Sequence, residues 1–144
     1  VYCSIMKIKG TSQVLNRLKS ISKEAELGVK SSVVRNTDQI YAEALANVPV
    51  LDGYLRGSGN TSYLNNQLTG TVAFGGNAAP YAPYVEFGTG SGVNVPQGFE
   101  AYAMQFYVNG KGTMRAQPFL IPAFIKYKKV FLNDIRKIAK KISK

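Results

Sequence analysis

The strongest constraint on the fold is an apolar stripe near the C-terminal end of the chain. Seven large apolar side chains recur there at steps of three or four, the spacing of one face of an amphipathic α-helix. They are Leu120, Phe124, Tyr127, Phe131, Ile135, Ile138 and Ile142. Pro122 fits such a helix only in its first turn, so the helix is expected to begin at Phe119 or Pro122. A helix with this stripe needs a second apolar surface to pack against.

A second stripe in the N-terminal part of the chain predicts another long helix. Its apolar positions also recur mostly at steps of three and four: Leu15, Leu18, Ile21, Ala25, Val29, Val33, Ile40 and Ala44. Thr11 or Ser12 offers an N-cap, and the helix should end by Val48 because Pro49 disfavours helical geometry in the residue before it. Gly28 lowers the helix propensity and marks a place for a kink or break.

Two segments in the middle of the chain predict an antiparallel hairpin. Residues 60–65 and 68–74 have strand composition and are joined around Asn66 and Gln67. Gly70 weakens the second strand because glycine has no side chain to pack. Further along, residues 101–108 also have strand composition, and a turn at Asn109-Gly110 predicts a second hairpin completed by residues 113–117.

A short helix is expected around residues 81–88, where Tyr81, Tyr84 and Val85 share one face at helical spacing and Gly88 ends the turn. The chain of 144 residues has the length of about one domain. We therefore predict a single α+β domain over 1–144, in which a long N-terminal helix and a C-terminal helix pack on a small antiparallel sheet. Residues 1–7 are expected to be an irregular extension, and residues 89–115 a long loop and hairpin.

The composition argues against an enzyme. The chain has no histidine, which removes the commonest general base and metal ligand, and one cysteine, Cys3, which excludes an internal disulfide and fits a reducing compartment. No apolar run approaches the ~20 residues that span a bilayer. A bare S-x-x-K pattern at Ser20–Lys23 and the glycine-rich residues 88–92 lack the rest of the motifs they would need. We assign no catalytic, cofactor-binding or metal-ligating residue.

Asp52 and Glu86 are the candidates for a carboxylate pair of the glycoside-hydrolysing kind, but each has a simpler structural role. Asp52 precedes Gly53 in a strong turn pair. Glu86 lies between Val85 and Phe87, and it is expected to pair with a cation such as Arg56 or Arg115.

Positive charge is concentrated at the C-terminal end. The chain carries a net charge of +10, with 18 basic and 8 acidic residues. The candidate basic face comprises Lys129, Arg136, Lys137, Lys140 and Lys141. Its simplest interpretation is a solvated helix face whose last cations suit the helix dipole; the alternative is a surface for nucleic acid or an acidic protein.

Two proline-rich motifs, read together, resemble a known family. Pro80-Tyr-Ala-Pro-Tyr-Val-Glu-Phe-Gly-Thr89 is followed by Ala116-Gln-Pro-Phe-Leu-Ile-Pro-Ala123. This pair, after a long amphipathic helix, a Pro49-Val50 step and a hairpin, is similar to the neck and tail-completion (head–tail joining) proteins of long-tailed bacteriophages. The resemblance extends from about Ile8 to the C-terminal end.

The resemblance implies a virion structural protein of the phage neck or tail, assembled in the host bacterial cytoplasm. It would form a ring, expected to be hexameric, that contacts the tail terminator, the tail tube or head-closure (connector) proteins, near DNA and without a membrane. Residues 89–115 would dock on neighbours while the α+β core holds its shape. The motif and assembly residues would be Tyr81, Tyr84, Glu86, Phe87, Gly88, Gln117, Pro118 and Phe119. The alternative function is a basic nucleic-acid-binding module.

Overall fold

The computed structural model describes residues 5–7, 23–50, 53–106 and 111–142. Several predicted features lie outside these residues: the N-cap at Thr11 or Ser12, Asp52 of the turn pair, the turn at Asn109-Gly110, and Cys3.

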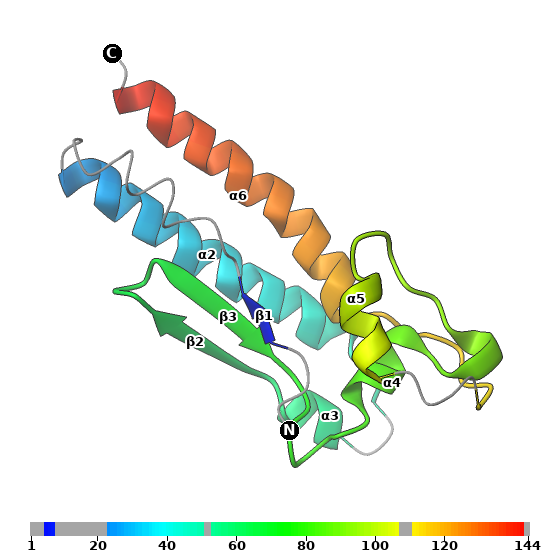
Figure 1. Ribbon diagram of the computed structural model, residues 1–144. Helices are drawn as coiled ribbons and strands as arrows, with labels where there is room; N and C mark the ends of the chain where they lie inside the picture. The colour runs from blue at the N-terminus through cyan, green and yellow to red at the C-terminus, as the bar shows by residue number, and fades with distance from the viewer. Residues whose placement is uncertain (1–4, 8–22, 51–52, 107–110, 143–144) are drawn as a thin grey trace.

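The described residues confirm the predicted α+β fold. Two long helices, α2 (Lys23–Asn47) and α6 (Leu120–Ile142), lie side by side, and the small sheet covers another side of α2 (Figure 1). The sheet is antiparallel, with β3 (Thr69–Ala73) between β1 (Ile5–Lys7) and β2 (Asn60–Leu64). The two helices that the apolar stripes predicted are therefore each other's packing partners.

The helix pair is antiparallel, and ion pairs mark its length. They join Lys141 to Glu24 at 3.1 Å, Asp134 to Arg35 at 2.5 Å and Lys126 to Glu43 at 2.6 Å. α2 continues through Gly28, where no break occurs. A Cβ at Gly28 would lie 3.5 Å from the Ile138 side chain, so this glycine lies in contact with α6.

The apolar stripes bury into two adjoining core clusters. One, at the sheet end of the helix pair, holds Ile40, Ala44, Val72, Phe74, Phe119 and Leu120 among its buried members. The second joins the helices further along through Val29, Val33 and Phe131. At about 1.5–3 kcal/mol for each large side chain that is fully buried, this packing is the main source of stability.

The hairpin β2–β3 forms as predicted, and Gly70 explains how closely α2 approaches it. Asn65, Asn66 and Gln67 make the turn with positive φ angles of 52°, 54° and 65°, a conformation that asparagine tolerates better than most residues. A Cβ at Gly70 would lie 1.9 Å from the Thr37 Oγ1 of α2. Helix α2 therefore crosses the sheet at Gly70, where the strand has no side chain in the way.

The prediction of an irregular extension over residues 1–7 is wrong for Ile5–Lys7. These residues form β1, which pairs with β3 through Ile5 opposite Ala73 and Lys7 opposite Thr71. The reason is that the central position of β3 offers backbone partners on both edges, and a short segment far away in the sequence occupies the second edge. Residues 1–4 lie outside the described part.

Three further short helices lie between the two long ones in the sequence. α3 (Tyr54–Gly57) directly follows Gly53 and precedes the hairpin. After the hairpin, α4 (Ala82–Phe87) is the short helix predicted from the first motif, and α5 (Glu100–Ala103) continues into a 3₁₀ turn at Met104–Phe106. Gly88 ends α4 with a positive φ of 78°.

The strand predicted over residues 101–108 is wrong where the structure describes it, because residues 100–106 are helical. Aromatic residues suggested a strand, but Phe99, Tyr102, Ala103 and Phe106 are spaced by three and four and face one cluster. Residues 113–117 carry no strand assignment either, and their backbone bonds to the loop after α4. Short helical turns therefore stand where the first strand of the predicted second hairpin was expected, as far as residue 106.

Candidate functional site

The two proline-rich motifs are far apart in the sequence but meet at the N-terminal end of α6. We call residues 81–89 and 116–123 together the motif junction. The backbone N–H of Gln117 donates a hydrogen bond to the Val85 carbonyl at 2.8 Å, and the buried ring of Phe119 packs in the cluster that holds Leu120 and half-buried Tyr81 and Val85. The motif junction is thus one structural unit rather than two surface features.

Glu86 is the centre of this unit. Its Oε2 accepts hydrogen bonds from the backbone N–H groups of Phe119 and Leu120 at 2.9 and 3.0 Å, and its Oε1 accepts one from Ile121 at 2.9 Å. These are the donors that the first turn of α6 leaves without a partner inside the helix, and Pro122, next in line, has no N–H. A carboxylate from α4 therefore caps α6, which has no acid in its own first turn.

The prediction that Glu86 pairs with Arg56 or Arg115 is wrong. The Glu86 side chain is buried, with 4% of its surface exposed, whereas both arginines are exposed. Its compensation comes instead from three N–H dipoles and the positive end of the helix dipole. Sequence spacing gave no sign of this, because the carboxylate and its donors are more than thirty residues apart.

Burial raises the pKa of the Glu86 carboxyl above its ordinary value of 4.5, and the three N–H donors oppose this without cancelling it. A raised pKa means that the folded state holds the proton more tightly than the unfolded state. The pH-dependent contribution of Glu86 to stability is therefore greatest below pH 4.5 and declines as the pH rises through the folded-state pKa.

The chain beyond Gly88 is held against residues 112–116 by backbone contacts. The Thr89 N–H donates to the Met114 carbonyl at 2.9 Å, the Met114 N–H donates back to the Thr89 Oγ1 at 3.0 Å, and the Ala116 N–H donates to the Gly92 carbonyl at 3.1 Å. A Cβ at Gly88 would lie 2.3 Å from that Gly92 carbonyl oxygen. Only glycine fits this crossing.

We call residues 89–115 the excursion; its described residues 95–106 pack against the motif junction. Phe87, Ala103 and Ile121 form a third buried cluster, against which Val95, Phe99, Tyr102 and Phe106 pack. The Phe87 and Tyr102 rings meet edge to face at 5.9 Å, as do those of Tyr102 and Phe106 at 5.3 Å. The residues expected to dock on neighbours thus have a small core of their own, supplied partly by the motif junction.

The structure brings the predicted motif residues together with different exposures. Glu86, Phe87, Gly88 and Phe119 are buried, Tyr81 and Tyr84 are half-buried, and Gln117 and Pro118 are exposed. Gly92 and Met114 form backbone hydrogen bonds with Ala116 and Thr89 of the motif junction, although the sequence did not single them out. The signal available for them was weak: a glycine-rich loop is usually an unstructured connection.

The sequence also gave no prediction of a partly buried polar cluster between the long helices. Asp134 Oδ2 accepts hydrogen bonds from Asn36 Nδ2 at 3.1 Å, Ser32 Oγ at 3.3 Å and Arg35 at 2.5 Å. The available signal was that Ser32 and Asn36, four residues apart, lie among apolar positions of the first stripe. Burial alone would raise the pKa of Asp134, but these hydrogen bonds and the Arg35 charge hold it below its ordinary value.

Replacing Asp134 by Asn should flatten the acid limb of the stability profile. A lowered folded-state pKa contributes stability above pH 3.8, which is lost as the pH falls through the folded value. We expect the variant to be less stable by about 1–2 kcal/mol at pH 7. Its stability should converge with that of the wild type as the pH falls through the folded-state pKa of Asp134. Urea unfolding across this range measures both. Glu24→Gln, which breaks an exposed pair, should change stability by less than about 0.5 kcal/mol; parallel acid limbs for wild type and Asp134→Asn would contradict the assignment.

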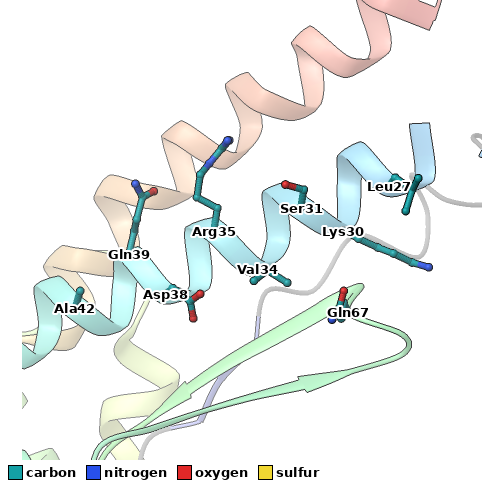
Figure 2. A pocket seen from close by; sticks show the side chains of 9 residues that line it. All are labelled: Leu27, Lys30, Ser31, Val34, Arg35, Asp38, Gln39, Ala42 and Gln67. Carbon is teal, nitrogen blue, oxygen red and sulfur yellow. The ribbon is translucent and has the colours of Figure 1, made fainter. Parts of the chain in front are cut away.

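An open groove follows the solvent side of α2 above the end of the hairpin (Figure 2). Its charged side chains are already engaged: Lys30 with Glu26 at 2.6 Å, Arg35 with Asp134, and Asp38 as acceptor for the Tyr63 hydroxyl. Burial and the Asp38 hydrogen bond raise the pKa of Tyr63 to about 12. The groove is lined by Leu27, Lys30, Ser31, Val34, Arg35, Asp38, Gln39, Ala42 and Gln67. Because the charged side chains of this groove already have partners within the chain, we place the candidate functional site at the motif junction.

The predicted basic face divides into two parts. Lys129, Arg136, Lys137 and Lys140 are exposed on α6, while Lys141 turns towards α2 and pairs with Glu24. Among the described residues, no group of three potential metal-ligating side chains occurs. No helix in the described ranges is long and apolar enough to cross a bilayer.

Comparison of the chain with protein-family models, with curated proteins and with solved structures finds no match.

Proposed function

We propose that this chain is a virion structural protein of the neck or tail-completion region of a long-tailed bacteriophage, where it forms a ring that helps to join head and tail. The observation that carries the proposal is the meeting of the two motifs: Glu86 of the first caps the helix that the second begins. This contact gives the two motifs one shared structural role, which supports the proposal.

The mechanism we propose is assembly by surface complementarity. The layers of α2, α6 and sheet hold their shape through the buried stripes, and the excursion over residues 89–115 docks on the neighbouring copy. Its outer surface offers apolar anchors, since Met104 is 69% exposed and Met114 is 37% exposed. Methionine suits such contacts because its flexible side chain adapts to a partner surface.

The test is the mass of the purified chain in solution over a range of concentrations, together with electron microscopy of the same samples. We expect a closed ring of six copies, each of 15.7 kDa, as a discrete species that grows with concentration. A mass that stays at one chain throughout, with no rings in the images, would contradict self-assembly.

Replacing Met104 by Glu should prevent ring formation while the monomer stays folded. A carboxylate at the centre of an apolar contact must lose its hydration on assembly, which costs several kcal/mol unless it finds a partner. Leu27→Glu is the matched control, because Leu27 is exposed to a similar extent, 65%, but lies on α2. Sedimentation velocity and circular dichroism measure assembly and folding separately. Equal loss of rings in both variants would place the interface elsewhere.

A further inference from the structure

The outer face of α6 carries a row of cations with no acid among them. The row consists of Lys129, Arg136, Lys137 and Lys140. The last three follow Lys129 by seven, eight and eleven residues, so all four lie on one side of the helix. All four are exposed. We call these residues the α6 basic face.

The acids that could balance this row are turned the other way. Asp134, the acid within α6, points to α2 and binds Arg35 and Asn36. On α2, Glu43 binds Lys126 and Glu24 binds Lys141. The packing of α6 on α2 therefore places these three acids along the seam between the helices, while the α6 basic face carries four cations and no acid.

We propose that the α6 basic face binds the phosphate backbone of duplex nucleic acid. From Lys129 to Lys140 the helix spans roughly 17 Å, the length over which a duplex presents about ten phosphate charges. A rigid helix holds its cations in a fixed row, so that several phosphates can be contacted at once without ordering a loop.

The aromatic residues of α6 argue against a single strand as the partner. Single strands are bound through stacking on aromatic rings, but Phe124, Tyr127 and Phe131 of α6 pack into the cores. An acidic protein surface would be distinguished from a duplex by equal binding of polyglutamate. The proposal goes beyond ring assembly and does not depend on it.

Titration of the full chain into a labelled mixed-sequence DNA duplex of about 20 base pairs tests the proposal. With four phosphate contacts, affinity should fall about 100-fold between about 50 and 200 mM salt, a slope of roughly −3.6 in log K against log salt. The variant Lys129→Gln, Arg136→Gln, Lys137→Gln should retain a slope of about −1. The control variant Arg56→Gln, Lys111→Gln, Arg115→Gln removes the same charge from exposed positions elsewhere and should keep the wild-type slope.

Three outcomes would overturn it. Equal loss in both triple variants would mean that net charge, not this face, binds DNA. Tighter binding of a single strand of the same length, or equal binding of polyglutamate, would assign the face to a different class of partner. Absence of duplex binding at low salt, with circular dichroism showing intact helices, would leave the row as a solvated surface. Light scattering on the same triple variant separates this result from ring formation.

Discussion

Replacing Glu86 by Ala is expected to destabilise the protein by about 3–5 kcal/mol at pH 7. The substitution removes the acceptor for the backbone N–H groups of Phe119, Leu120 and Ile121, all of which belong to buried residues. A buried donor without a partner costs about 1–3 kcal/mol, and the first turn of α6 has no acid of its own to substitute. Urea unfolding monitored by circular dichroism measures the loss.

Two further variants separate the cap from other effects. Glu86→Gln keeps one carbonyl oxygen in nearly the same volume, so we expect about half the loss. Glu100→Ala removes an exposed carboxylate that accepts one backbone N–H, that of Gly98 at 2.8 Å, and should cost under about 1 kcal/mol. If Glu86→Ala stayed within about 1 kcal/mol of the wild type, Glu86 would not be the link between α4 and α6.

Hydrogen exchange would show where that loss is felt. Because Glu86 joins α4 to the first turn of α6, exchange should rise first at residues 119–121 and within the excursion that packs on Phe87 and Ile121. Residues near Val29 and Val33 belong to the separate cluster with Phe131, so their protection should fall only with global unfolding. The cap therefore couples the proposed docking segment to the core.

The sequence predicted the parts of the fold that depend on periodicity. The stripe from Leu120 to Ile142 predicted a helix beginning at Phe119 or Pro122, and α6 begins between them, at Leu120. The hairpin followed from two strands around Asn66 and Gln67. These features are local: each residue's role follows from neighbours three, four or two positions away. The missing side chain at Gly70 was visible in the sequence, but its role was not: it leaves room for Thr37 of α2 to pack directly on strand β3.

The parts that sequence reasoning missed depend on contacts between distant segments. Glu86 was expected to need a cation, but its partners are backbone groups, which any residue carries and no side-chain pattern reveals. Strand β1 depends on the free edge of β3, more than sixty residues later. Residues 101–108 were predicted to be a strand because their aromatic composition outweighed a helical spacing, and over so short a segment the two patterns are hardest to separate. The described part of this segment, residues 101–106, is helical.

Replacing Gly88 by Ala is expected to detach the excursion while the helix pair survives. Gly88 has φ 78° and ψ −176°, a region that is essentially restricted to glycine and costs other residues about 1–3 kcal/mol. An alanine Cβ would also meet the Gly92 carbonyl oxygen at 2.3 Å and the Met114 carbonyl oxygen at 2.8 Å. Both are backbone atoms, so no side-chain rotation relieves the contact. We expect a total loss of at least about 3 kcal/mol, concentrated in this region.

Gly98→Ala isolates the steric part of this effect. Gly98 also has a positive φ, 89°, but a Cβ there would meet nothing within 4 Å, so it should cost only about 1 kcal/mol. Limited proteolysis compares the two: Gly88→Ala should be cut rapidly between residues 89 and 115 at a temperature where Gly98→Ala and the wild type resist. Such a cut chain should still show the α2–α6 helical signal but form no rings, because the docking surface is held in shape by the crossing at Gly88. Equal resistance of both variants would mean that the backbone crossing does not hold the excursion.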